Sequence, residues 1–383
     1  MEIGSIFEMN PNCIEKINLS SGEFLRLKEV DKYGKKNTIY TASAREAISL
    51  MLYSVEKEYP KIKKKCMMPA YMCDTVFIPF VRNGWDLIFY HIGKDMKADR
   101  TELAALIQRE KPDLLFIHDY YGVDTWAEMR PFLEECRSRG LLIIEDVTQA
   151  YYLDAGSTAD YIIGSLRKWY AVADGGFVTT NNIIHEEIVV KDDAFAMERF
   201  QVLSQKWDYL QRIQEKENVL HEEQKEALKR QKEEYLFRNR ELEECLDNYK
   251  KVTAISDMSK ELLAMTDEET AKMCRKANFM ILSEGLAERK TVVSVMGDYE
   301  GTVAPLYFPV YMEDRNTIQE YLRKQDIYVP VLWPVAKENK QVLSETEQYI
   351  FSHIAAIPLD QRYAEADMQR IVAVIKEFEE TCQ

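Results

Sequence analysis

Residues 113–147, DLLFIHDYYGVDTWAEMRPFLEECRSRGLLIIEDV, form the stretch of sequence that decides the fold. Its two ends, DLLFIHDYYG (113–122) and LLIIEDV (141–147), are apolar runs with the length of buried strands. The intervening WAEMRPFLEECRSRG (126–140) has the composition of an amphipathic helix. Strand, helix and strand in this order predict two parallel strands joined by a helical crossover.

The same alternation of strands and helices continues on both sides of this stretch. Further predicted strands are KKCMMPAY (64–71), WDLIFYHIG (85–93), ADYIIGSL (159–166) and GGFVTT (175–180). Further predicted helices are TASAREAISLMLYSVEKEY (41–59) and RTELAALIQREK (100–111). The pattern predicts an α/β fold, in which helices cover both faces of a mostly parallel sheet. In such a sheet, functional groups gather at the carboxyl ends of the strands.

The middle of the chain has a different character, because no glycine lies between Gly176 and Gly285. Strong helix formers fill HEEQKEALKRQKEEYLFRNRELEECLDNYKK (221–251), so we expect long helices over about residues 185–250. Their apolar residues form an irregular stripe: Trp207, Leu210, Ile213, Leu220, Leu228, Tyr235, Leu242 and Leu246. A stripe without a strict heptad favours a surface helix packed on the domain over a free coiled coil.

The last hundred residues alternate between strands and helices again. The predicted strands are TVAPLYFPVYM (302–312) and IYVPVLWP (327–334), and the predicted helices are NTIQEYLRKQ (316–325) and EADMQRIVAVIKEFEE (365–380). This pattern predicts a second, smaller α/β domain. We therefore expect a large domain over residues 1–260 and a small C-terminal domain over residues 261–383.

Composition and charge narrow the class of protein. The 383 residues are 46% hydrophobic, which suits well-packed cores. The formal charge of −15 argues against nucleic acid or an anionic membrane as the partner. The seven cysteines have no metal-ligand spacing, the first residues do not read as a signal peptide, and no apolar run is long enough to span a bilayer. These features predict a soluble cytoplasmic protein without a metal site.

Two strand ends carry residues suited to catalysis. Asp146 directly follows an apolar strand, and Lys168 stands just past another strand, about twenty residues later. A buried acid and an amine at neighbouring strand ends suit pyridoxal phosphate: the amine forms a Schiff base, and the acid keeps the pyridine nitrogen protonated. A purely structural ion pair between Asp146 and Lys168 is the alternative.

A helix start adds a third feature. Ser43-Ala44-Arg45-Glu46 opens the first predicted helix, with Ser43 as N-cap and Glu46 three residues on, the pattern of a capping box. The free N–H groups of a helix start also bind phosphate. Together with Asp146 and Lys168, this helix start fits the phosphate end of the same cofactor.

Taken together, these motifs resemble the DegT/DnrJ/EryC1/StrS family of sugar aminotransferases, which are fold type I pyridoxal phosphate enzymes and homodimers. Ser43-Ala44-Arg45 stands where that family has its phosphate segment, and IIEDVTQAYY (143–152) resembles its aspartate motif. The resemblance makes Asp146 the partner of the pyridine nitrogen and Gln149 a neighbour of the phenolic oxygen. Lys168 precedes Gly175-Gly176 by the family's usual distance and becomes the Schiff-base lysine.

The sequence also departs from the family pattern. Ser165 and Lys168 have a short Ser-x-x-Lys spacing, with Ser165 a candidate for the cofactor phosphate. Cys73 stands where the family commonly has an aromatic residue stacked on the ring. The family's Asn-x-Arg segment, which reaches the partner subunit's phosphate, has Asn239-Arg240 as its nearest counterpart, and we interpret that run as a solvated helix face.

By resemblance, the chain transfers an amino group from an amino acid, glutamate or glutamine, to a keto sugar, in a nucleotide-linked form, for polysaccharide or secondary-metabolite biosynthesis. His118, Tyr120, Tyr121 and Trp333 are further candidates for the walls of the site. Two alternatives stay open: another fold type I reaction on a non-sugar substrate, and a non-catalytic relative that kept the fold for binding.

Overall fold

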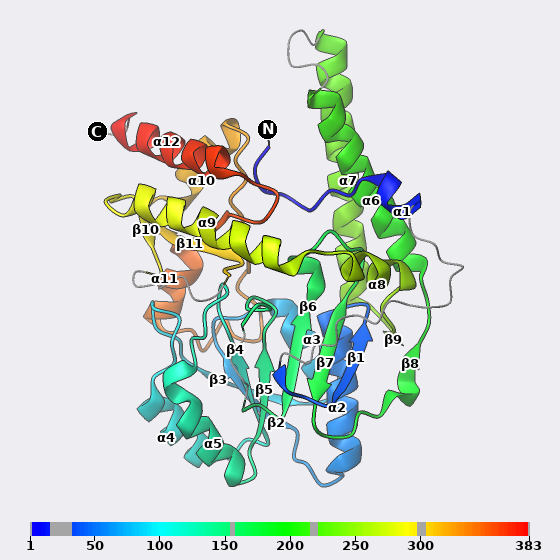
Figure 1. Ribbon diagram of the computed structural model, residues 1–383. Helices are drawn as coiled ribbons and strands as arrows, with labels where there is room; N and C mark the ends of the chain where they lie inside the picture. Colours follow the sequence, from blue (N-terminus) through cyan, green and yellow to red (C-terminus); the bar gives the residue numbers. More distant parts are fainter. Residues whose placement is uncertain (1, 16–32, 154–157, 215–220, 297–303, 382–383) are drawn as a thin grey trace.

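The computed structural model describes residues 2–15, 33–153, 158–214, 221–296 and 304–381 (Figure 1). The first-quoted stretch folds as β4 (Leu114–His118), α5 (Arg130–Ser138) and β5 (Leu142–Asp146). Strands β4 and β5 pair in parallel, with His118 opposite Asp146 at their carboxyl ends. The predicted crossover is therefore confirmed, and it brings these two polar residues side by side.

The central sheet has seven strands in the order β1-β7-β6-β5-β4-β2-β3. Its other strands are β1 (Asn37–Thr41), β2 (Lys65–Pro69), β3 (Asp86–Tyr90), β6 (Tyr161–Ser165) and β7 (Gly176–Thr180). Strand β7 runs antiparallel to both of its neighbours, and the remaining pairs are parallel. The prediction of an α/β fold with a mostly parallel sheet is confirmed.

Helices cover both faces of this sheet. On one face lie α2 (Ala44–Glu58) and α3 (Asp74–Arg82), whose buried residues pack with Met68, Phe116 and Ile163. On the other face lie α4 (Arg100–Glu110) and α5, packed against Met67 and Ile117. Because successive residues of a strand point to opposite faces, the continuous apolar runs of the sequence supply both cores.

The C-terminal part holds a three-stranded antiparallel sheet, β10-β11-β12. Its elements are α9 (Glu268–Leu286), β10 (Val292–Ser294), β11 (Tyr307–Met312), α10 (Arg315–Lys324), α11 (Glu345–His353), β12 (Ile354–Pro358) and α12 (Glu365–Thr381). Ile3, near the start of the chain, is buried in the core of this part. The proposed division of the chain at residue 260 stays a prediction.

The strand predicted for IYVPVLWP (327–334) is wrong. Only Ile327 forms a β-bridge, to Ile3, and the following described residues are irregular. Pro330 and Pro334 lack the N–H groups that a strand ladder needs. The segment instead places Trp333 at the carboxyl end of β4, against the ring of His118, with the two ring centroids 5.6 Å apart.

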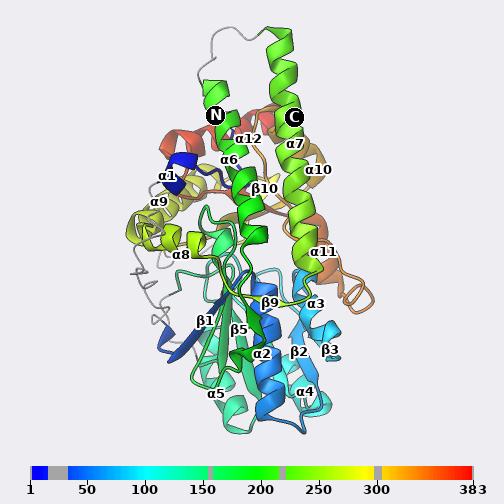
Figure 2. The same ribbon diagram turned by 90° about the vertical axis from the view of Figure 1, so that its right-hand side faces the viewer.

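The predicted helical middle forms α6 (Ala194–Gln214) and α7 (Glu222–Asp247), which pack side by side. Tyr235 and Leu242 of α7 are buried against residues of α6, as the apolar stripe predicted. The helices pack on the domain at their near ends, where Phe200 and Leu203 of α6 contact Ala173, and their far ends project beyond the body of the protein (Figures 1 and 2). The remaining elements are α1 (Pro11–Glu15), α8 (Asp257–Ala264), and the parallel pair β8 (Val189–Val190) and β9 (Val252–Thr253).

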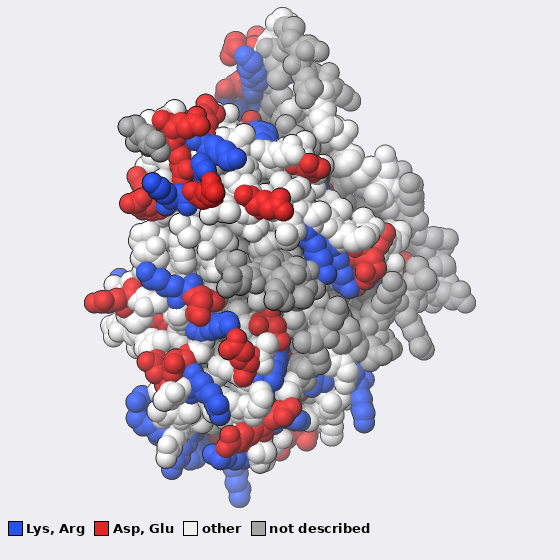
Figure 3. All heavy atoms as spheres, turned by 60° about the vertical axis from the view of Figure 1, so that its left-hand side comes forward, with Lys and Arg blue, Asp and Glu red and all other residues white. Residues whose placement is uncertain are grey.

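Charges on the surface are mixed. On the face shown in Figure 3, the Lys and Arg side chains alternate with Asp and Glu side chains over the described part of the chain. Among the residues that the structure describes, no helix is long and apolar enough to cross a membrane. The described residues also contain no cluster of His, Cys, Asp and Glu that could hold a metal ion.

Two consecutive glycines let β7 approach the start of α2. Gly175 has a φ of 141°, and its N–H donates to the carbonyl of Ala42 at 2.8 Å. A Cβ added to Gly176 would lie 2.2 Å from the carbonyl carbon of Ser43. The glycine pair therefore allows the close backbone contact that holds Ser43 beside the strand ends.

We expect Gly176→Ala to lower the free energy of unfolding by about 3 kcal/mol, because the backbone of Ser43 has to move. Gly34→Ala is the control: a Cβ there meets nothing within 4 Å, although Gly34, unlike Gly176, has a positive φ, of 64°. Its cost is limited to backbone strain of about 1 kcal/mol. Urea unfolding of the two variants checks the difference, and equal destabilisation would contradict the proposed collision.

Candidate active site

One large cavity, of about 980 Å³, opens where the strand ends meet α2, α7 and the C-terminal part. It is lined by all eight residues that the sequence singled out: Ser43, Ala44, Arg45, Cys73, Asp146, Gln149, Ser165 and Lys168. His118 and Trp333 line it as well, whereas Tyr120 and Tyr121 do not belong to its lining and are buried in the core beside it. Residues far apart in the sequence are thus brought to a single pocket.

Asp146 is held rigidly at the end of β5. Its Oδ2 lies 3.0 Å from Nδ1 of His118, and its Oδ1 accepts the N–H of Thr148 at 2.9 Å. Nε2 of His118 is buried without a hydrogen-bond partner among the described residues. With a proton on Nδ1, His118 donates to Asp146. The carboxylate is 2% exposed, and each of its oxygens keeps acceptor capacity for a further donor.

Lys168 ends a short 3-10 helix, Leu166–Lys168, that follows β6. Its amine makes no hydrogen bond or ion pair with the described residues, although water reaches it through the cavity. The surrounding protein lowers the pKa of Lys168 by desolvation, and the charges of Arg167 and Arg45 lower it further, against the opposite effects of Glu243 and Cys73. A structural ion pair between Asp146 and Lys168 is not formed. The lysine is a free amine with a raised neutral fraction.

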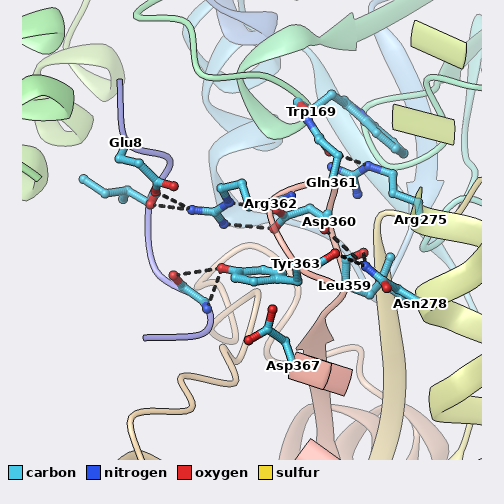
Figure 4. Close-up of polar contacts among 12 residues, drawn as sticks. Glu8, Trp169, Arg275, Asn278, Leu359, Asp360, Gln361, Arg362, Tyr363 and Asp367 are labelled. Atoms are coloured by element: carbon cyan, nitrogen blue, oxygen red, sulfur yellow. Dashed lines mark hydrogen bonds and ion pairs between the residues drawn. The ribbon is translucent and has the colours of Figure 1, made fainter. Parts of the chain in front are cut away.

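The backbone around Lys168 is fixed by the next residue, Trp169. The indole N–H donates to the carbonyl of Thr148 at 2.9 Å, and Gln361 donates to the carbonyl of Trp169 at 2.7 Å. The guanidinium of Arg275 lies 4.7 Å from the ring and donates to Gln361 at 3.0 Å. Figure 4 shows Gln361 between Arg275 and Trp169. The backbone of Lys168 is therefore held by its neighbours, while its amine has no partner among the described residues.

The start of α2 carries an N-cap at Ser43. Its hydroxyl accepts the N–H of Glu46 at 3.3 Å and donates to Oε2 of Glu46 at 2.7 Å. The other carboxylate oxygen of Glu46 accepts the N–H of Thr253, so the predicted capping box is closed through β9 rather than through the backbone of Ser43. The first N–H groups of α2, those of Ala44 and Arg45, make no backbone hydrogen bond outside the helix ladder. These two N–H groups lie at the start of α2, beside the cavity, where they are available to an anion.

Three further predicted residues surround the same space. Gln149 accepts the N–H of Tyr121 at 2.9 Å, which leaves its amide nitrogen without a partner among the described residues. The Ser165 hydroxyl likewise makes no hydrogen bond there. Cys73 lies 3.1 Å from the hydroxyl of Thr75, and burial raises the pKa of its thiol, so the thiol stays protonated and packs as a small polarizable group.

Two arginines that the sequence did not single out, Arg167 and Arg199, lie beside Arg45 at this end of the cavity. Arg167 and Arg199 both donate to Oε1 of Glu243, and Arg45 lies 3.2 Å from Asp247 and 3.8 Å from Glu243. We call Arg45, Arg167, Arg199 and Glu243 the arginine cluster. Burial raises the pKa of Glu243, but the charges of Arg167, Arg199 and Lys168 outweigh it and hold that pKa below its ordinary value.

One face of α7 lines the cavity with four residues: Lys232, Leu236, Asn239 and Glu243. The interpretation of Asn239-Arg240 as a solvated face is therefore correct for Arg240, which is exposed, and wrong for Asn239. The spacing of four, three and four residues is the only signal in the sequence that could have revealed this face.

A second polar cluster joins the start of the chain to the C-terminal part. Arg362 forms a bidentate pair with Asp360, at 2.7 and 2.9 Å, and donates to Glu8 at 3.0 Å (Figure 4). Burial raises the pKa of Asp360, but the Arg362 guanidinium outweighs it and holds that pKa low. The pair closes the far side of the cavity and keeps the N-terminal segment in place.

The chain is similar to known proteins in its sequence and in its fold. The sequence profile of the DegT/DnrJ/EryC1/StrS aminotransferase family matches residues 26–376. No curated relative matches the chain by sequence.

Solved structures share the fold at low identity. PseC from Helicobacter pylori, an aminotransferase involved in the biosynthesis of pseudoaminic acid, is 14% identical, with a TM-score of 0.66 and 100% of both chains covered. The sugar aminotransferase CalS13 from Micromonospora echinospora is 15% identical, with a TM-score of 0.66, over 98% of this chain and 100% of that chain. A DegT DnrJ EryC1 StrS aminotransferase from Brucella abortus is 15% identical, with a TM-score of 0.65, over 96% of this chain and 94% of that chain.

The chain therefore belongs to the DegT/DnrJ/EryC1/StrS aminotransferase family. It is a pyridoxal phosphate-dependent aminotransferase with the fold type I architecture. The resemblance read from the sequence is confirmed, and the alternative of a relative kept only for binding is dropped.

Proposed function

We propose that this aminotransferase moves an amino group from glutamate or glutamine to the keto group of a nucleotide-linked sugar, with pyridoxal phosphate held in the cavity described above. The observation that carries the proposal is the pairing, in one pocket, of an unpartnered amine at Lys168 with an anchored carboxylate at Asp146. The family membership supports the reaction class.

The residues present fit the cofactor. Lys168 offers an amine without a partner, and Asp146 offers a buried carboxylate with acceptor capacity left for a protonated ring nitrogen. The start of α2 offers N–H groups to the phosphate, and Gln149 offers a free amide nitrogen to a phenolic oxygen. When bound, pyridoxal phosphate supplies an electron sink for the bonds at the donor's α-carbon.

The chain's own groups handle the protons and charge. Nζ of Lys168, when neutral, accepts a proton from the donor's α-carbon and returns it. The carboxylate of Asp146 would stabilise a positive charge opposite it, while His118 fixes the orientation of that carboxylate. Cys73 and Trp333 form part of the cavity wall around these groups.

The size and lining of the cavity support a large polar acceptor. Its volume of about 980 Å³ is at the upper end for small-molecule pockets. Beyond the residues assigned to the cofactor, polar side chains of α10 and the segment after it line the space: Asn316, Gln319, Glu320, Arg323 and Tyr328. A sugar carries many hydroxyls, which need such partners. We propose a cytoplasmic homodimer as the working form, by analogy with the family.

An isotope experiment tests the substrate class. The holoenzyme is incubated with glutamate carrying ¹⁵N on its α-amino group, together with either a panel of nucleotide-linked keto sugars or a panel of simple 2-oxo acids. Transfer of ¹⁵N to a nucleotide-linked sugar, detected by mass spectrometry, is the expected result. Transfer to 2-oxo acids alone would favour the other candidate, a reaction on a non-sugar substrate.

A further inference from the structure

The arginine cluster brings three guanidinium groups together around one carboxylate, that of Glu243. Arg45, Arg167 and Arg199 all line the cavity here. Three further carboxylates lie near them, those of Asp247, Asp74 and Asp174. The guanidinium groups lie at the end of the cavity where the N–H groups that begin α2 are found.

Several hydrogen-bond donors of the cluster have no partner among the described residues. Arg167 and Arg199 each bond Glu243 through one terminal nitrogen, and the other terminal nitrogen of each has no partner among the described residues. Their Nε atoms, and Nη1 of Arg45, are buried without a partner as well. The side chains of Arg167 and Arg199 are 10% and 8% exposed. Buried donors of this kind carry a desolvation cost that an anion would remove.

Glu243 explains how three like charges stay together. One carboxylate accepts hydrogen bonds from Arg167 on the 3-10 helix after β6 and from Arg199 on α6, and it lies within 3.8 Å of Arg45 on α2. It belongs to α7, so the projecting helical pair supplies two of the four members of the cluster. Glu243 acts as a positioning residue that keeps the guanidinium groups pointed to one space.

The geometry points to an anion subsite for a phosphoryl group, built within one chain by Arg45, Arg167 and Arg199 around Glu243. This inference rests on the proposed function, because the phosphoryl group comes either from the cofactor or from a nucleotide-linked substrate. It also gives the α6–α7 pair a role in ligand binding. The oxygens of a phosphate match the fork geometry of the free guanidinium nitrogens.

The test measures phosphate-dependent binding by the full-length chain freed of cofactor. Arg199→Gln keeps a donor for Glu243 and removes the charge; Arg167→Gln is the second variant. Arg212→Gln, an exposed change on the same helix, is the control. Each protein is titrated with pyridoxal phosphate, with pyridoxal, which lacks the phosphate, and with uridine diphosphate, and thermal unfolding is followed in inorganic phosphate.

We expect each cluster variant to bind one phosphorylated ligand about 10-fold to 100-fold more weakly than wild type, the loss of one charge-assisted hydrogen bond. Weaker pyridoxal phosphate binding with unchanged pyridoxal binding assigns the subsite to the cofactor. Weaker uridine diphosphate binding alone assigns it to the substrate. Inorganic phosphate should raise the unfolding temperature of wild type and of Arg212→Gln more than that of the cluster variants.

Equal affinities for both phosphorylated ligands, with equal phosphate stabilisation, in wild type and in cluster variants that remain folded would overturn the inference. Failure of the proposed function looks different. In that case wild type itself binds no pyridoxal phosphate, while the stabilisation by inorganic phosphate still reports on the arginine cluster.

Discussion

Lys168→Ala is expected to reduce the rate of transamination by at least about 10⁴-fold, because it removes the amine that we propose both bonds the cofactor and acts as the base at the α-carbon. Lys168→Arg should fail equally, since a guanidinium stays protonated and cannot fill either role. Lys191→Ala, which removes an exposed lysine paired with Asp257, should keep the wild-type rate. The measurement is the rate of amino transfer from glutamate, with circular dichroism to confirm folding.

The reaction of Lys168 with added pyridoxal should depend on the ionisation of its amine. The protein environment lowers the pKa of this lysine, with desolvation as the largest cause. Its neutral fraction therefore rises with pH and becomes substantial at a lower pH than for an ordinary lysine. We expect covalent capture of added pyridoxal by the cofactor-free chain to rise with pH through a midpoint below 10.5, the ordinary lysine value. A midpoint at or above that value would contradict the assignment of a desolvated amine.

Asp146→Asn is expected to lower the turnover number on the order of 10²-fold to 10³-fold, the size of effect seen when a preorganised charge partner is removed. The amide keeps the size of the side chain and can still accept the N–H of Thr148, but it cannot balance a positive ring nitrogen. Asp113→Asn is the matched control: this residue caps the opposite end of β4 through the N–H of Lys65 at 3.0 Å. Unchanged turnover in Asp146→Asn would contradict the proposed charge pairing.

Much of the fold could be predicted because its strands are short, continuous apolar runs. Buried parallel strands need apolar residues on both faces, and LLIIEDV and DLLFIHDYYG show this directly. Helix α3 was not predicted, because Pro79 lies inside it and its nine residues give little periodic signal. Strand β1 was missed as well, because three of its five residues, Asn37, Thr38 and Thr41, are polar.

Some residues of the candidate site could likewise be predicted from the sequence, and others could not. Asp146 and Lys168 stand at the ends of predictable strands, so the sequence could place them near each other, and the structure puts both in one cavity. Arg199 and Glu243 are 44 residues apart on helices whose composition reads as solvent-exposed. Their meeting depends on how α6 and α7 pack on each other and on the body, which no local pattern encodes.

The central claim is that Lys168 is the lysine that holds the cofactor. The most direct measurement is reduction of the pyridoxal phosphate-loaded enzyme with borohydride, which makes the bond between cofactor and lysine permanent, followed by peptide mapping by mass spectrometry. We predict one modified lysine, Lys168, in the peptide after β6. Modification of another cavity lysine such as Lys232, or of none in an enzyme that turns over, would contradict the account.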